Sequence, residues 1–150
     1  SCHPRECWIN WLNPFVLCGE LRSIEVAEGN QHFIVVDGVL FNKEMTRLIS
    51  FTACKKREYQ IPKSVTHIGQ NAFQGCSELE TVSIPSSVTS ILCSAFYECS
   101  GLTSITIPRS VSSIGPKVFM NCSRLRNVSV PRGLTYPKDT FPEGAKISKY

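Results

Sequence analysis

Apolar residues recur along this chain with a fixed spacing of 23 residues. The pair Ile61-Pro62 returns as Ile84-Pro85, Ile107-Pro108 and Val130-Pro131. The same step separates Phe73, Phe96 and Phe119, then Cys76, Cys99 and Cys122, then Leu79, Leu102 and Leu125, and then Ile68, Ile91 and Ile114. A fixed period of roughly 20 to 50 residues is the signature of a repeat protein. Chance does not produce so many matched positions in three successive units.

Each unit predicts strands separated by tight corners. The segment Leu79-x-x-Val82-x-Ile84 alternates apolar and polar residues, which is typical of a half-buried strand. Pro85 then ends the strand because proline has no amide hydrogen to donate. The spacing Val88-x-x-Ile91 is compatible with a second short extended piece. The three-residue spacing in Ala95-Phe96-x-x-Cys99-x-x-Leu102 predicts a short helical or 3₁₀ turn.

A unit of this size cannot bury its own apolar face, so successive units must stack. We therefore expect a right-handed solenoid of mainly β or α/β class, with a parallel sheet that takes one strand from each repeat. The helical or 3₁₀ turns should lie on the convex side. Phe73, Phe96 and Phe119 should form a column from one coil to the next.

The motif Ile-Pro-x-Ser-Val-x-x-Ile-Gly-x-x-Ala-Phe-x-x-Cys-Ser-x-Leu-x-x-Val resembles the 23-residue, BspA-like class of leucine-rich repeats. The resemblance covers roughly residues 15–136. It departs at Leu92, which stands where Gly69 and Gly115 stand, and at Pro137, which takes the Ile68-type position. It implies a leucine-rich-repeat solenoid and a role in contacting proteins or cells.

The chain reads as one domain whose ends depart from the regular repeat. Residues 62–130 hold three regular repeats, and residues 15–26 match Phe73–Ile84 at a constant offset, which predicts a partial repeat. Residues 1–14 are expected to be an N-terminal cap or degenerate repeat. Residues 131–150 are expected to be a C-terminal cap, polar where the period is lost from residue 137 onward.

Residues 27–61 form an irregular repeat that is longer than one period. The surplus falls in residues 33–51, where two apolar runs flank Asn42 and Lys43. Asparagine beside a polar residue is a common turn signal, so a β-hairpin inserted into the solenoid is predicted here.

Eight cysteines fall into two groups. Cys18, Cys76, Cys99 and Cys122 occupy one repeat position, so we expect a ladder of buried free thiols that donate weakly to backbone carbonyls. Cys2 and Cys7 lie in the N-terminal segment, where a disulfide between them is one interpretation. A zinc site with Cys2, His3 and Cys7 is another, although no second ligand pair follows at zinc-finger spacing. We expect no metal and no cofactor.

The net charge of +4 is concentrated near the C-terminus. Residues 101–150 carry eight Lys and Arg residues against Asp139 and Glu143, which indicates either an acidic partner or a solvated basic face. No run of 18 apolar residues occurs, so no membrane span is predicted. The one basic cluster beside the hairpin, Lys55-Lys56-Arg57, has no interleaved aromatic residues and does not indicate nucleic-acid binding.

No catalytic motif accompanies the repeats, and His67 occupies a repeat position that elsewhere holds Ser90 and Ser113. We therefore predict a protein that is not an enzyme. The alternate strand residues should instead line an open, concave sheet face that binds an extended polypeptide or a glycan. The expected ligand-binding residues are Ser23, Glu25, Glu58, Gln60, Thr81, Ser83, Ser104, Thr106, Asn127 and Ser129, with Arg109 and Arg132 beside them.

Two functions are compatible with these patterns. The first is a secreted or surface-attached module, extracellular or periplasmic, that mediates adhesion to a matrix protein, a cell-surface protein or a glycan, as the family resemblance implies. The second is a structural protein that associates weakly with itself through the hairpin or the solenoid ends. Sedimentation at rising concentration separates the two.

Overall fold

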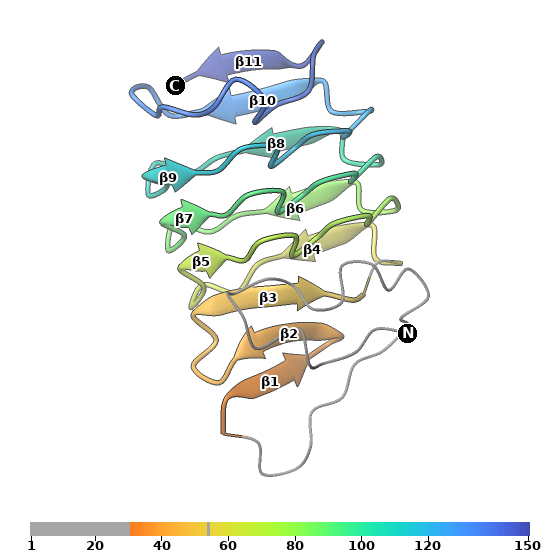
Figure 1. Cartoon of the computed structure of the whole chain (residues 1–150), viewed down its shortest axis with the longest axis vertical. Coiled ribbons are helices and arrows are strands. Elements are labelled where there is room, and N and C mark those ends of the chain that lie inside the picture. The colour runs from red at the N-terminus through yellow and green to blue at the C-terminus, as the bar shows by residue number, and fades with distance from the viewer. Residues whose placement is uncertain (1–30, 54) are drawn as a thin grey trace.

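The structure is a computed structural model that describes residues 31–53 and 55–150. This part of the chain is a stack of coils, which Figure 1 shows rising from β1 to β11. The predicted leucine-rich-repeat solenoid is confirmed. Adjacent strands in the regular region are parallel and paired with the 23-residue offset: Glu58 lies opposite Thr81, and His67 lies opposite Ser90.

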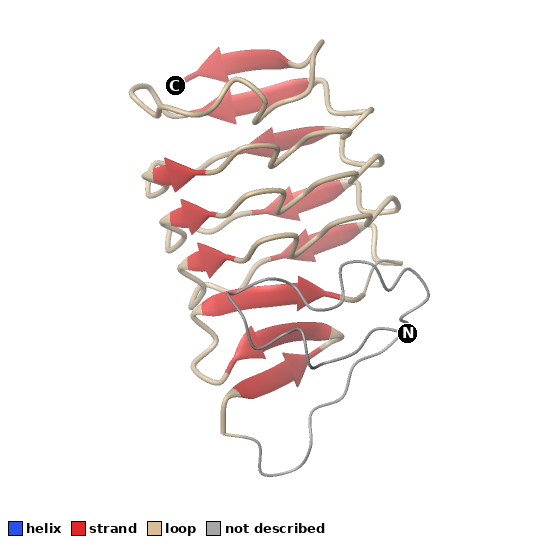
Figure 2. Ribbon diagram, in the orientation of Figure 1, coloured by secondary structure: helices blue, strands red, loops and turns tan. Residues whose placement is uncertain are grey.

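Each regular coil contributes two strands instead of the single strand expected. The first strands run along one side of the stack: β4 (Glu58–Gln60), β6 (Thr81–Ser83), β8 (Ser104–Thr106) and β10 (Asn127–Val130). The second strands run along the other side: β5 (His67–Ile68), β7 (Ser90–Ile91) and β9 (Ser113–Ile114). Figure 2 shows the two sets of strands, with loops joining them at both ends. Two residues are enough for this second ladder because each strand is held by the coils before and after it.

The inserted hairpin is also confirmed, and it is part of the stack. Strands β1 (Phe33–Val36), β2 (Val39–Asn42) and β3 (Arg47–Phe51) form an antiparallel meander. Asp37 and Gly38 connect the first two with φ of 51° and 77°, the backbone geometry that a two-residue hairpin turn requires. The Asn42 side-chain oxygen accepts hydrogen bonds from the amides of Thr46 and Arg47, which closes the second turn. β3 then pairs in parallel with β5 and leads the meander into the second-strand sheet.

The expected helical or 3₁₀ turns are not found in the described residues, where this prediction was wrong. The corners are successive turns, closed by bonds such as Ala72 N–H to Gly69 O (3.2 Å) and Cys76 N–H to Phe73 O (3.2 Å). Two positions in every repeat adopt a left-handed backbone, which stops a helix from propagating. They are Asn71, Ser94 and Lys117 at φ of 56–57°, and Gly75, Glu98 and Asn121 at 60–76°.

Backbone amides freed by these turns donate to the following coil. Phe73 N–H bonds to Ala95 O at 2.7 Å, and Gly75 N–H bonds to Tyr97 O at 2.9 Å. The corner therefore satisfies its amides between coils, which a helix would satisfy within one segment. Leu92 bonds to the preceding coil as its glycine counterparts do: its amide donates to Ile68 O at 3.0 Å, and Gly115 N–H donates to Ile91 O at 2.9 Å.

A column of stacked phenylalanine rings runs through the core. The centroids of Phe73 and Phe96 lie 4.6 Å apart and those of Phe96 and Phe119 lie 5.2 Å apart, with interplanar angles of 10° and 7°. Phe51 stacks at one end and Phe141 at the other, at 4.8 and 5.4 Å. The column predicted from the repeat is therefore confirmed, and the meander and the C-terminal segment extend it.

The C-terminal segment forms a further, shortened coil at the end of the stack. Its strand β11 (Lys146–Lys149) pairs in parallel with β10, and Phe119 N–H bonds to Thr140 O at 2.8 Å. All four residues of β11 are exposed, including Ile147, which lies opposite buried Val128. The segment thus covers the preceding coil but buries little of its own strand.

We expect Phe96→Ala to cost more stability than Phe141→Ala. Phe96 is fully buried and stacked on both sides, so its removal should lower the free energy of unfolding by about 3–5 kcal/mol. Phe141 has one stacked neighbour and retains some exposure, so its loss should cost less. Urea unfolding followed by circular dichroism measures both. Equal decreases in the free energy of unfolding for the two variants would contradict the expectation that Phe96 is stabilised by stacking on both sides.

Candidate functional site

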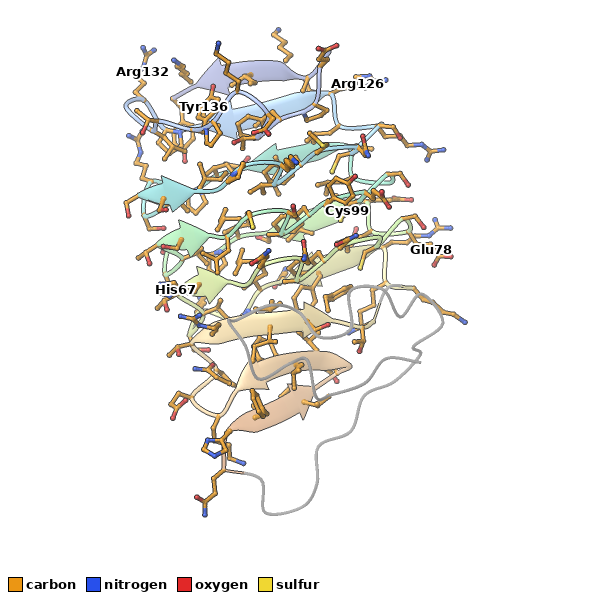
Figure 3. The ribbon with its side chains drawn as sticks, viewed as in Figure 1. His67, Glu78, Cys99, Arg126, Arg132 and Tyr136 are labelled. Atoms are coloured by element: carbon orange, nitrogen blue, oxygen red, sulfur yellow. The ribbon has the colours of Figure 1, made fainter. Side chains whose placement is uncertain are left out.

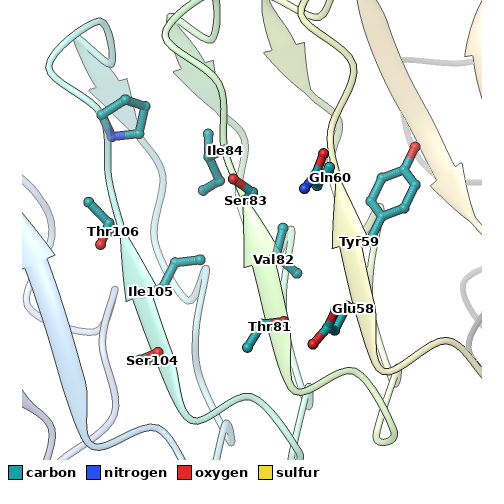
Figure 4. Close-up of a pocket in the computed structure, with 11 residues that line it drawn as sticks. Glu58, Tyr59, Gln60, Thr81, Val82, Ser83, Ile84, Ser104, Ile105 and Thr106 are labelled. Atoms are coloured by element: carbon teal, nitrogen blue, oxygen red, sulfur yellow. The ribbon is translucent and has the colours of Figure 1, made fainter.

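Outward side chains of the first strands form what we call the polar sheet face. One row along it contains Glu58, Thr81, Ser104, Asn127 and Lys146, and the next contains Gln60, Ser83, Thr106, Ser129 and Ser148. Figure 4 shows the first three members of each row at matching heights on β4, β6 and β8. Nearly all are exposed, while the residues between them, such as Val82 and Ile105, are buried. The face is therefore polar outside and apolar underneath.

Hydroxyl groups have different roles on the two sides of the stack. Beside the second strands, the hydroxyls bond to carbonyls of the preceding coil: Thr66 to Thr46 at 3.1 Å, Ser87 to Val65 at 2.8 Å and Thr89 to Thr66 at 3.2 Å. Ser110 is an exception, with a buried hydroxyl that has no partner. On the polar sheet face, the hydroxyls of Thr81, Ser83, Ser104, Thr106 and Ser129 make no hydrogen bond to any described residue. These are free to bond outside the chain.

The two ends of the polar sheet face differ in charge. At the β4 end, Glu58 is exposed, and Arg57 and Glu80 form an exposed ion pair at 3.9 Å. At the β11 end, Arg126 and Lys146 lie on adjacent coils, joined by the Lys146 N–H bond to Arg126 O at 2.7 Å. Among the described residues neither has a carboxylate within ion-pair distance. The face therefore runs from an acidic side chain to unpaired basic ones.

Arg109 and Arg132 lie at the other end of the strands, after β8 and β10. The Arg109 guanidinium packs over the Tyr150 ring at 4.8 Å, and Arg132 N–H bonds to the Tyr150 carbonyl at 2.8 Å. Tyr150 in turn donates its hydroxyl to Ile107 O at 2.6 Å. Figure 3 shows Arg132 and His67 on one lateral side of the stack, and Arg126 and Glu78 on the other. The basic side chains therefore flank the C-terminal half of the polar sheet face from both sides.

A shallow hollow of about 400 Å³ lies on the polar sheet face between β4 and β8 (Figure 4). Its lining comprises Glu58, Tyr59, Gln60, Thr81, Val82, Ser83, Ile84, Ser104, Ile105, Thr106 and Pro108. Six of the eight predicted ligand-binding residues on β4 to β10 thus lie around one hollow. Asn127 and Ser129 lie beyond it on β10. Sequence reasoning missed Ile84 and Tyr59 because both occupy positions that the repeat pattern assigns to the core.

Tyr59 packs beneath the β4 end of this hollow. Its ring lies 4.8 Å from that of Phe51 and 6.1 Å from that of Phe73, and the Lys56 ammonium lies 5.9 Å from the Tyr59 ring centroid. Burial raises the pKa of Tyr59 to about 12 because it disfavours the phenolate, and the negative charge of Asp37 adds to the shift.

The repeat cysteines that the structure describes are buried. The thiol of Cys99 donates to Phe73 O and that of Cys122 donates to Phe96 O, both at 3.0 Å. Cys76 reaches Phe51 O at 3.8 Å. Cys93 is partly exposed and forms no disulfide with a described residue. The predictions for Ser23, Glu25, Cys18 and the pair Cys2 and Cys7 fall outside the described residues.

Within residues 31–53 and 55–150, no three His, Cys, Asp or Glu residues lie close enough together to hold a metal ion. No helix there has the length and apolar character needed to cross a membrane.

Comparisons with known proteins identify the repeat. A family model described as a BspA type leucine rich repeat region matches residues 47–150 in six copies. No curated protein matches the chain.

Three solved bacterial structures share the fold. A leucine-rich repeat protein from Eubacterium ventriosum is 27% identical, with a TM-score of 0.73 over 86% of this chain and 42% of its own. A leucine rich cell surface protein from Faecalibacterium prausnitzii is 22% identical, with a TM-score of 0.66 over 80% and 39%. The pneumococcal vaccine antigen PcpA is 24% identical, with a TM-score of 0.58 over 85% and 45%. This chain spans less than half the length of each.

Alkaline pH should destabilise the protein through Tyr59. Because the pKa of Tyr59 is raised in the folded state, its contribution to stability is complete below pH 10 and is lost as the pH rises from 10 to about 12. In Tyr59→Phe this loss should be absent, so the free energy of unfolding should fall less steeply across that window than in the parent. Urea titrations at several pH values measure the two slopes. Equal slopes of the free energy of unfolding against pH in the parent and in Tyr59→Phe would contradict a buried phenol. Asp37→Asn should also reduce the slope, by a smaller amount than Tyr59→Phe.

Proposed function

Since this chain belongs to the BspA-type leucine-rich-repeat family, we propose that it is a non-enzymatic binding module whose polar sheet face holds a partner protein. The observation that carries this proposal is the different use of hydroxyls on the two sides of the stack. Beside the second strands the hydroxyls mostly bond between coils, whereas on the polar sheet face they make no bond to a described residue. A regular array of exposed donors and acceptors without internal partners suits recognition through many hydrogen bonds.

The energetics favour a partner that is itself rich in hydrogen-bonding groups. A hydroxyl that loses water and gains no partner costs about 1–3 kcal/mol, whereas a formed hydrogen bond contributes only about 1 kcal/mol net. A purely apolar partner would therefore lose affinity at each row of the polar sheet face. A polypeptide in extended conformation offers a backbone donor and an acceptor at every residue, so it matches the rows well.

Charge should influence how fast and in which orientation the partner binds. Glu58 lies at one end of the polar sheet face, and Arg126 and Lys146 lie near the other. Exposed charges of this kind steer encounters and are screened by salt over about 10 Å at 0.1 M ionic strength. We therefore expect association to slow as salt is added.

The proposal includes a location outside the cell or at its surface, where an adhesion module meets host or matrix proteins. The family assignment supports this location, and the burial of Cys76, Cys99 and Cys122 is compatible with an oxidising environment. Labelling of intact source cells with a membrane-impermeant amine reagent tests it. Label that enters the protein only after lysis would contradict a surface location.

Binding should be lost when a bulky cation blocks the polar sheet face. The chain is tested against a panel of immobilised matrix proteins, with glycosaminoglycans in parallel and at two salt concentrations. We expect Ser104→Arg to raise the Kd of a bound protein at least about tenfold, equivalent to about 1.4 kcal/mol. Ser113→Arg is the matched control, because Ser113 is also exposed and begins β9 on the other sheet. A larger loss for Ser113→Arg, or no binding to any protein at micromolar concentration, would contradict the proposal.

A further inference from the structure

The ladder of first strands is interrupted between β6 and β8. β4 and β6 form one sheet, and β8, β10 and β11 form another, although β6 and β8 belong to consecutive coils. On either side of the interruption an equivalent bond closes the ladder: Ile61 N–H donates to Ser83 O at 3.1 Å, and Ile107 N–H donates to Ser129 O at 2.8 Å. The matching bond, from Ile84 N–H to Thr106 O, is not formed in the described structure. The first-strand ladder is therefore open at this bond.

The missing bond coincides with a change in the burial of Ile84. At the same repeat position, Ile61 is 4% exposed and Ile107 and Val130 are fully buried, whereas Ile84 is only half-buried and lines the hollow. Its side chain lies beside Ser83 and faces the gap toward Thr106 in Figure 4. A partly exposed apolar side chain and an amide without a described partner thus occur together at one residue that lines the hollow.

The hollow combines an apolar base with a polar rim. Ile84 and Pro108 supply apolar surface above the buried Val82 and Ile105, and Thr81, Ser83, Ser104 and Thr106 surround it with hydroxyls that have no described partner. At about 400 Å³ it falls within the size range of specific ligand sites. A periodic sheet face offers equivalent positions at every coil, whereas this hollow occurs at the one interruption of the first-strand ladder in the described residues.

We propose that this hollow is the specificity subsite of the polar sheet face and that it receives an aliphatic side chain from an extended segment of the partner polypeptide. The inference rests on the proposed function. The inserted side chain packs against Ile84, a backbone carbonyl of the segment accepts from Ile84 N–H, and flanking backbone groups bond to Ser83 and Thr106. An aliphatic side chain packed against Ile84 removes apolar surface of both side chains from water, which favours binding.

A glycan fits this hollow less well. Its hydroxyls would lie over Ile84, whose side chain cannot hydrogen-bond to them. The Tyr59 ring does not offer a free face either, because it packs against Phe51, Phe73 and Lys56.

Charge sets the direction of the bound segment. Glu58 borders the hollow on β4, and Arg109 follows Pro108 on the β8 side, where no described carboxylate pairs with it. Two strand spacings of about 4.8 Å separate β4 from β8, and Arg109 lies five residues beyond Ser104, the repeat counterpart of Glu58, so about six extended residues are needed to reach from one charge to the other. The segment therefore carries a basic residue toward Glu58, an acidic residue toward Arg109 and the aliphatic residue between them.

Selection of a displayed library of random short peptides on the whole chain tests this inference. The expected consensus is a basic, an aliphatic and an acidic residue, in that order, within about six residues. The Kd of a selected peptide should rise at least about tenfold with Ser83→Arg, and less than about threefold with Asn127→Arg, which lies on the same face beyond the hollow. Ile84→Asn should also weaken binding, with circular dichroism checking that the variant is folded. Glu58→Lys should weaken the parent peptide and restore affinity for a peptide whose basic residue is changed to Glu.

The outcomes distinguish this inference from the proposed function. If Asn127→Arg blocks the peptide and Ser83→Arg does not, the hollow is not the subsite although the polar sheet face still binds. If Ser113→Arg blocks it and neither face variant does, both the inference and the proposed function are wrong. A selection with no enriched consensus overturns the inference, as does competition of the selected peptide by heparin oligosaccharides that bind at the Ser83 position.

Discussion

Stacking of coils in one register is the constraint on which the rest of this structure depends. Each coil buries its apolar face only against its neighbours, so every column must keep the same offset. The phenylalanine rings show how strictly it is kept, since Phe73, Phe96 and Phe119 stack within 5.2 Å and nearly parallel. A slip of one residue would place side chains of the opposite face in the core, which the dry interior cannot accommodate. The buried thiols follow the same rule, because Cys99 and Cys122 each bond to the carbonyl of the phenylalanine one coil earlier.

The register also decides which polar groups remain available. A side chain beside the second strands lies near a carbonyl of the preceding coil, so Thr89 bonds to Thr66 and Ser87 to Val65. On the first strands the backbone groups are used in the ladders, and the side chains of Ser104 and Thr106 point away from the stack. The same residue types therefore strengthen one side of the molecule and form a potential binding surface on the other.

Specific recognition requires a departure from the repeat, because a periodic surface offers a partner several equivalent registers. Two departures occur on the polar sheet face. The charge changes from Glu58 at one end to Arg126 and Lys146 near the other, and the ladder opens between β6 and β8 to expose Ile84. The opening lies in the stretch where six of the predicted ligand-binding residues are grouped. The stability of the stack comes from the buried positions that all coils share. Selectivity for a partner would come from the positions on the polar sheet face at which the coils differ.

The 23-residue period by itself determined the solenoid, the phenylalanine column and the outward rows of polar residues, because each follows from which positions a stacked coil must bury. The surplus over one period in residues 33–51, with its turn signal, located the inserted hairpin. Only the tertiary structure decided the rest. Left-handed residues such as Glu98 and Lys117 replaced the expected helical turns with corners that bond between coils, which residue types alone do not reveal. The exposure of Ile84 depends on a hydrogen bond that its counterparts Ile61 and Ile107 form and it does not. That difference arises from the spacing of two neighbouring strands, a property that no single repeat encodes.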